Sequence, residues 1–181
     1  YHHNGYSPNF DKSRSIRVDS LSFNADGTIK QVFPTLRGVG ISNAAENIQL
    51  DRYSAISDKG AAIDFANDNV KADSTLRFEG WKIALEPNAW VRYEKAEVKD
   101  AAAKKAWIRV RAAKPAALKL DMQPMKKGAK KVSAPLDIKA TDGWRVVCVE
   151  VPAIAPGVYD ITLANVDKGN AVEVDWIRLE P

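Results

Sequence analysis

The sequence predicts an all-β protein whose main part is a jelly-roll β-sandwich. Hydrophobic residues recur mostly with a period of two, as in strands that bury one face. Proline and glycine separate many short segments of this kind, and these segments do not alternate with long helical patterns. The one helix-like segment, residues 99–105, is too short for more than a turn or two.

Size and composition fit one domain with an appendage. The chain has 181 residues, and 45% of them are hydrophobic, which is enough for a substantial core. The formal net charge of +4 is mild and does not by itself indicate nucleic acid. No apolar run approaches the length of a membrane span. The single cysteine, Cys148, excludes an internal disulfide, and its valine neighbours predict a small buried hydrophobic side chain.

The first 40 residues predict a β-hairpin. Alternating segments at 15–23 and 28–33 flank an Asp26-Gly27 turn, and Pro34 ends the second segment. Residues 41–46 are interpreted as a linker, and residues 47–181 as the sandwich. The strands expected in the sandwich are 47–50, 61–65, 75–78, 81–85, 90–98, 106–112, 117–122, 131–136, 144–151, 158–163 and 172–179.

The last predicted strand contains a carboxylate among apolar neighbours. Strict alternation puts Val172, Val174 and Trp176 on one face, and Glu173, Asp175, Ile177 and Leu179 on the other. A buried Asp175 must be paired, hydrogen-bonded or bound to a metal ion.

One dense basic cluster surrounds Gly128. It consists of Lys126, Lys127, Lys130 and Lys131. The favoured interpretation is a solvated hairpin tip, and the alternative is a patch that binds a polyanion.

From residue 47 to the end, the sequence resembles carbohydrate-binding module family 6. Four motifs occur in the order and approximate spacing of that family: residues 48–55 (IQLDRYSA), 89–93 (AWVRY), 141–144 (TDGW) and 174–177 (VDWI). Two of them depart from the family pattern, since Asp142 replaces the first glycine of "G-G-W" and Ile177 replaces the phenylalanine of "D-W-F". The resemblance implies a jelly roll that binds oligosaccharide or polysaccharide.

The first 40 residues resemble a different family. Residues 1–5 and 14–29 are similar to the last propeller blade of glycoside hydrolase family 43, whose members cut arabinose- or xylose-containing polysaccharides and often carry a family 6 module. The resemblance implies the tail of a longer enzyme, with the missing catalytic propeller as a partner and export to the cell surface, periplasm or medium. The catalytic carboxylates would lie in blades that this chain lacks, so the chain itself is expected to be noncatalytic.

The family's usual sugar site implies candidate residues here. Two aromatic rings cover the faces of a sugar, and an asparagine before the last strand binds its hydroxyls. Trp144 corresponds to the first ring, with a structural loop tryptophan as the alternative, and Trp81 is the nearest aromatic to the second, with core packing as the alternative. Glu173 stands where the family has asparagine, and Asn170 is the other candidate for that role.

The family also commonly carries a structural calcium ion, held by acidic residues of its first and last strands. Gln49, Asp51 and Asp175 occupy those positions, and their hard oxygen atoms suit calcium. The alternative is an aspartate bonded to backbone amides or paired with Arg52.

The sequence therefore predicts a noncatalytic polysaccharide-binding module, acting on xylan- or arabinan-like material by aromatic stacking, with no nucleic-acid or membrane partner. The alternative is a structural domain that supports a glycosidase propeller without binding sugar. The only histidines, His2 and His3, lie at the N-terminus, far from any predicted site.

Overall fold

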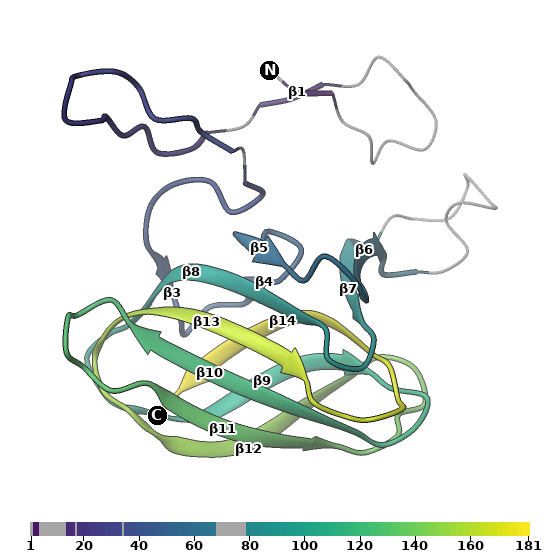
Figure 1. The fold of residues 1–181 in the computed structure, drawn as a ribbon. Helices are drawn as coiled ribbons and strands as arrows, with labels where there is room; N and C mark the ends of the chain where they lie inside the picture. Colours follow the sequence, from purple (N-terminus) through teal and green to yellow (C-terminus); the bar gives the residue numbers. More distant parts are fainter. Residues whose placement is uncertain (1, 4–13, 17, 34, 68–78) are drawn as a thin grey trace.

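The computed structural model describes residues 2–3, 14–16, 18–33, 35–67 and 79–181, and it shows two six-stranded β-sheets packed face to face (Figure 1). The predicted all-β sandwich is confirmed. Within the described residues there is no helix with the length and hydrophobicity that a membrane crossing requires.

The first sheet has five strands in a continuous path and a sixth beside β8. Their order is β11 (Val132–Ile138), β10 (Ala116–Pro124), β13 (Gly157–Asn165), β8 (Trp90–Val98) and β3 (Ser42–Asn43), with β5 (Ala55–Ile56) also pairing with β8. The β3 strand falls in the predicted linker and pairs with β8 in parallel. The segment leading into the module is therefore part of its first sheet.

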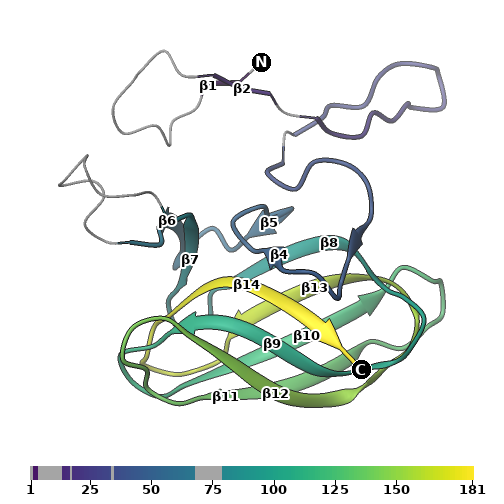
Figure 2. The same cartoon turned by 180° about the vertical axis from the view of Figure 1, so that it is seen from behind.

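The second sheet carries the candidate site on its outer face. Its order is β12 (Arg145–Ile154), β9 (Ala103–Arg111), β14 (Val172–Glu180), β7 (Trp81–Leu85) and β6 (Ala61–Phe65), with β4 (Ile48–Gln49) also pairing with β14. Figure 2 shows β9, β12 and β14 running side by side, while β6 and β7 rise away from the layer.

The core lies between the two sheets and is built by alternation. In β13, Tyr159, Ile161 and Leu163 point inward, and the residues between them are partly exposed. In β9, which belongs to the second sheet, Ile108 and Val110 point into the same core and are fully buried. Burying apolar surface stabilises such a core by about 25 cal/mol per Å².

The predicted facing of the last strand is wrong, because β14 contains an irregularity. Its pairing with β9 shifts register between Val174 and Ile177, so Val174 and Ile177 are both fully buried although three positions separate them. A bulge of this kind adds one residue to one strand and moves the following side chains to the opposite face. Trp176 consequently lies on the outer side of β14, where it is partly exposed.

Two further expectations are corrected by the structure. Residues 99–105 form no helix; they contain the turn after β8 and the beginning of β9. Cys148 is exposed, because it lies on the outer side of the edge strand β12, opposite Trp107 of β9. The strand predicted at 75–78 lies outside the described residues.

The N-terminal segment forms a short hairpin above the sandwich (Figure 1). Its turn is present as predicted, with one bridge between Phe23 and Ile29 and a bond from the Asn24 amide to the Thr28 carbonyl of 2.8 Å. Two outlying strands, β1 (His2–His3) and β2 (Arg14–Ser15), also pair. Phe23 and Ile29 are more than half exposed, so this hairpin has little core of its own.

Candidate functional site

Trp144 lies on the outer face of the second sheet, in the loop before β12. The preceding Gly143 has φ of +72°, a conformation that favours glycine and that makes the turn tight. The guanidinium groups of Arg109 and Arg111, which occupy outward positions of β9, lie 4.8 and 5.2 Å from the centre of the indole ring. The indole N–H donates a 3.0 Å hydrogen bond to the carbonyl of Ala66. The ring is thus oriented by several contacts and remains partly exposed.

Glu173 belongs to the same cluster. One carboxylate oxygen lies 2.7 Å from the ammonium nitrogen of Lys82, and the other accepts a hydrogen bond from Nε of Arg111. Arg111 therefore links the carboxylate to the Trp144 ring. Lys82 is 4% exposed, whereas Glu173 and Arg111 are each 25% exposed at the side chain, so those two are accessible to a ligand.

The pairing of Glu173 with arginine changes the hydrogen-bonding capacity of the site. An ionised carboxylate can only accept hydrogen bonds, whereas an asparagine both donates and accepts. The neighbouring Arg111 supplies the donors that Glu173 lacks, and Arg109 adds more at 26% exposure of its side chain. The outer face beside Trp144 therefore presents donors and acceptors together, as recognition of hydroxyl groups requires.

Trp81 lies on the side of β7 that faces the core. It shares its side of β7 with the buried Ile83, and its ring stacks on Phe65 with centroids 4.6 Å apart and planes inclined by 21°. The outward positions of β7 are Lys82 and Ala84, and Ala84 pairs directly with Glu173. The alternation of β7 thus places Trp81 on the side opposite Lys82, which contacts Glu173.

Asn170 shapes the loop between β13 and β14. Its side-chain amide donates a 2.8 Å hydrogen bond to the Pro115 carbonyl, and its backbone amide donates to the Asp167 carboxylate at 2.8 Å. Its own carbonyl accepts a bond from Asn165. These contacts fix the turn from which Glu173 follows, three residues later.

Sequence reasoning missed Asn165, which is fully buried at the end of β13. Its amide nitrogen donates to the carbonyls of Leu85 and Asn170 at 2.9 and 2.8 Å, and its oxygen accepts from the Asp167 amide at 3.0 Å. The sequence signal that could have identified Asn165 is a polar residue between Ala164 and Val166, at the apolar end of a predicted strand. Asn165 connects β7, β13 and the loop before β14.

The residues proposed to bind calcium lie where β4 meets β14. Gln49 pairs with Trp176, and the Leu50 amide bonds to the Asp175 carbonyl at 2.9 Å. Burial raises the pKa of Asp51; Arg52 opposes this effect, and the charge of Asp175 adds to it. The backbone bonds between β4 and β14 therefore place residues 49–51 beside Asp175.

The carboxylate of Asp175 already has a cationic partner. It is 8% exposed and accepts a hydrogen bond from the guanidinium of Arg109. Burial raises the pKa of Asp175, and the bond to Arg109 opposes that rise. Within the described residues, no group of three or more His, Cys, Asp or Glu side chains is placed to hold a metal ion. The oxygen donors suit calcium, but the ion would share Asp175 with Arg109.

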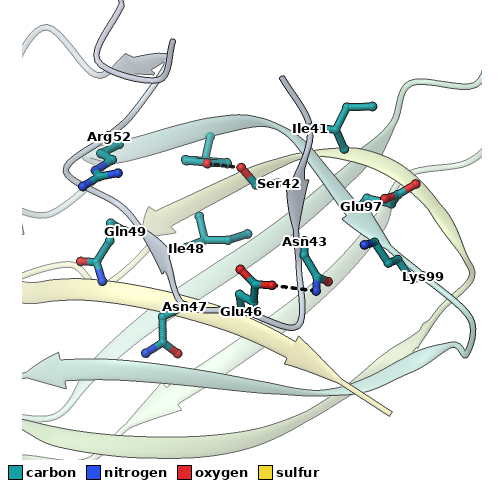
Figure 3. A pocket seen from close by; sticks show the side chains of 11 residues that line it. Ile41, Ser42, Asn43, Glu46, Asn47, Ile48, Gln49, Arg52, Glu97 and Lys99 are labelled. Atoms are coloured by element: carbon teal, nitrogen blue, oxygen red, sulfur yellow. Dashed lines mark hydrogen bonds between the residues drawn. The ribbon is translucent and has the colours of Figure 1, made fainter. Parts of the chain in front are cut away.

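A polar pocket of about 440 Å³ adjoins this region, between the β3–β4 segment and β8. Gln49 and Arg52 line one side of it, and Glu97 and Lys99 line the other (Figure 3). The hydroxyl groups of Ser42 and Tyr93 form a 2.6 Å hydrogen bond at its wall. Gln49 therefore faces a space open to solvent rather than the core.

The sandwich has the fold of solved family 6 carbohydrate-binding modules. A module from Clostridium stercorarium in complex with cellobiose superposes with a TM-score of 0.60 and 20% identity, over 78% of this chain and 97% of that one. A β-1,3-glucan-binding module from Bacillus halodurans gives 0.61 and 21%, over 78% and 100%. No protein-family model matches the sequence, and no curated protein matches it.

A longer solved protein covers more of this chain. It is a glycoside hydrolase family 43 arabinoxylan arabinofuranohydrolase from Bacillus subtilis in complex with cellotetraose, with a TM-score of 0.60 and 14% identity. The match extends over 90% of this chain and 33% of that one.

Proposed function

We propose that this chain is a noncatalytic module that binds polysaccharide at the surface around Trp144. The observation that carries the proposal is the linked arrangement of a partly exposed indole ring, Arg111 and Glu173 on one outer face. An aromatic ring covers the apolar face of a pyranose, while charged groups beside it bind the hydroxyls. The solved modules of this fold, bound to cellobiose or named for β-1,3-glucan, support the class of ligand.

The proposed ligand is a neutral, plant-type polysaccharide related to xylan or arabinan. In the site, the ring of Trp144 would stack on a sugar, Glu173 would accept hydroxyl protons, and Arg109 and Arg111 would donate to hydroxyl oxygens. The ring of Trp81 stacks on Phe65, so the proposal assigns the sugar contact to Trp144. A dissociation constant near 1 mM corresponds to about −4 kcal/mol, and one stacking contact with a few hydrogen bonds can supply it.

Titration calorimetry with xylo-, arabino- and cello-oligosaccharides tests this proposal. Trp144→Ala should abolish the binding heat. Trp107→Ala is the matched control, since Trp107 is also a partly exposed indole on the outer face of β9, with Arg178 5.4 Å from its ring. No heat with any sugar, or equal loss in the two variants at unchanged melting temperature, would refute the assignment.

We propose further that the chain is the C-terminal part of an exported family 43-type glycosidase. The match to a family 43 enzyme over 90% of this chain supports this origin, and the exposed apolar side chains of the N-terminal hairpin are suited to packing against a preceding domain. Sequencing the coding region upstream of Tyr1 tests the proposal. A catalytic propeller and a secretion signal are expected there, and a different upstream domain would contradict it.

Calcium is proposed as a structural ion held by Gln49, Asp51 and Asp175. When bound, it would neutralise the carboxylates where β4 meets β14. A ligand at 100 times its dissociation constant stabilises a folded protein by about 2.7 kcal/mol. Thermal melting in calcium and in chelator should therefore differ for the unaltered protein and not for Asp51→Asn. Identical melting in both conditions would show that Arg109 alone satisfies Asp175.

A structural role is the second candidate, and the contacts of the N-terminal segment favour it. Arg37 donates a 2.8 Å hydrogen bond to the Glu94 carbonyl and lies 4.4 Å from the Tyr93 ring, while Thr35 donates two hydrogen bonds to Asp19. These contacts fasten the hairpin to β8. If no saccharide binds, but removal of the sandwich destabilises the parent propeller, the supporting role is the function.

A further inference from the structure

We propose that the end of the sandwich farthest from Trp144 is a second binding site, specific for acidic, uronate-containing polysaccharide. The carrying feature is an apolar groove whose charged lining residues are all lysines. This inference goes beyond the neutral-sugar site and uses none of its residues.

The groove lies between the tip of the β10–β11 hairpin and the turn from β12 to β13. Its volume is about 570 Å³, within the range of roughly 300–1,000 Å³ that small-molecule sites occupy. The floor is aliphatic, and the residues that form the groove are Pro124, Met125, Lys126, Ala129, Lys130, Val132, Ala153, Ala155, Pro156, Gly157, Val158 and Tyr159. Met125 is 53% exposed within it.

The hairpin tip is held in place by the backbone. The Met125 amide donates a 2.9 Å hydrogen bond to the Val158 carbonyl, which ties the tip to β13. The Ala129 amide bonds to the Lys126 carbonyl at 3.2 Å, and Gly128 has φ of +80°. The groove walls are therefore formed by the fold, while the long lysine side chains remain adjustable.

The charge of this hairpin is strongly one-sided. Residues 116–138 contain five lysines and two aspartates, whereas the whole chain has a formal net charge of only +4. Asp121 is 3.2 Å from both Lys119 and Lys131. Within the described residues, Lys126, Lys127 and Lys130 take part in no ion pair. The local field therefore attracts anions to the groove.

The combination of lysines and an aliphatic floor favours an acidic polysaccharide over nucleic acid. A uronate chain carries a carboxylate on each sugar unit and presents apolar C–H faces between them, which suit the lysines and the floor respectively. Single-stranded nucleic acid requires aromatic surfaces for its bases. The one aromatic ring of the groove, Tyr159, is 6% exposed, and its hydroxyl donates to the Ala155 carbonyl.

The two proposed sites are at opposite ends of β12. Trp144 precedes the first residue of this strand, and the groove includes residues that follow its last, Ile154. The module can therefore contact a neutral and an acidic chain at once. Two such contacts raise the apparent affinity for a mixed wall polysaccharide through the effective concentration of the second site.

The test uses polygalacturonate, neutral xylan and single-stranded polyadenylate as probes in affinity electrophoresis and calorimetry. Lys126→Glu/Lys130→Glu should weaken binding to polygalacturonate by about fivefold or more, since each exposed ion pair contributes modestly and reversal adds repulsion. High salt should likewise weaken the binding of polygalacturonate to the unaltered protein. Lys59→Glu/Lys139→Glu is the matched control, because it changes two exposed lysines elsewhere by the same net charge.

The outcomes separate this site from the Trp144 site. Trp144→Ala should retain binding to polygalacturonate, and the paired glutamate variant should retain whatever binding of neutral sugar the unaltered protein has. Met125→Asp should weaken only the acidic probe, through the floor of the groove. If the two double variants lose binding to polygalacturonate equally, the loss follows from net charge alone, and the proposal is overturned. Tighter binding of polyadenylate than of polygalacturonate would overturn it too.

Discussion

Asn165 offers a direct test of how the loop before β14 is held. Replacement by alanine removes three hydrogen bonds of 2.8–3.0 Å from a fully buried side chain. At about 1 kcal/mol for each bond, the free energy of unfolding should fall by about 3 kcal/mol. For a chain of this size that corresponds to a drop in melting temperature of roughly 6–12 °C.

Asn165→Asp sharpens the test because its shape is nearly unchanged. The new carboxylate can still accept from the Asp167 amide, but it faces the carbonyls of Leu85 and Asn170 with no proton to donate. At pH 7 this variant should be less stable than Asn165→Ala, although it creates a smaller cavity. Contact models based on volume alone predict the opposite order.

The pH dependence of Asn165→Asp follows from the same geometry. Burial and the two carbonyls disfavour the charged form, so the folded-state pKa should lie above the unfolded value of about 3.9. A carboxyl group whose pKa rises on folding stabilises the folded protein at pH values below its unfolded-state pKa. This stabilisation is lost as the pH rises through the folded-state pKa. Urea unfolding at several pH values should therefore show that the stability lost by Asn165→Asp, relative to the unaltered protein, is smallest at acid pH. A deficit that does not change with pH would refute the proposed bonding.

Three further predictions concern other parts of the chain. Burial raises the pKa of Asp121, but hydrogen bonds from Ser133, Lys119 and Lys131 outweigh it and lower the pKa. The resulting stabilisation is present above about pH 3.9 and is lost as pH falls through the lower folded value, so Asp121→Asn should flatten the acid limb of the stability profile. Arg37→Met should loosen the hairpin and speed chymotryptic cleavage at Phe33 several-fold. Leu163→Ala should lower the unfolding free energy by about 2–5 kcal/mol, because Leu163 is fully buried.

Each of these has a clear opposing result. An unchanged acid limb in Asp121→Asn would mean that its lysine and serine contacts do not persist in solution. Cleavage at the original rate in Arg37→Met would mean that the hairpin is held by other contacts. A change in unfolding free energy under about 1 kcal/mol for Leu163→Ala would place this side chain outside a packed core.

The strand content was predictable because alternation is a local property. The segments 81–85 and 90–98 were predicted with the same limits as β7 and β8. Their inward residues, including Ile83 and Val91, are fully buried. The Asp26-Gly27 turn was predictable for the same reason, since its conformation depends on neighbouring residues only.

The facing of β14 was not predictable, because a bulge depends on the partner strand. Nothing in the sequence from Val174 to Ile177 marks the position where pairing with β9 shifts register. Beyond it, every side chain lies on the face opposite to the one that alternation assigns. This shift leaves Asp175 beside Arg109 and places Trp176 outside the core.

The candidate site shows the same division. Trp144 and Glu173 were identified as candidate site residues from the sequence, through a family resemblance, and their role stays a prediction. Their connection through Arg111 was not identified from the sequence, because Arg111 lies more than 30 positions before Trp144 and more than 60 before Glu173, so only the ladder of β9, β12 and β14 brings these residues together.

By itself, the order of residues determined that this protein is built from strands, where most of them run and which loops turn tightly, since each of these depends on interactions between near neighbours. Only the tertiary structure decided which side chains share a surface. Pairing between distant strands sets that register, so the charges around Trp144, the bonding of Asn165 and the lysine-lined groove became visible only in the folded chain.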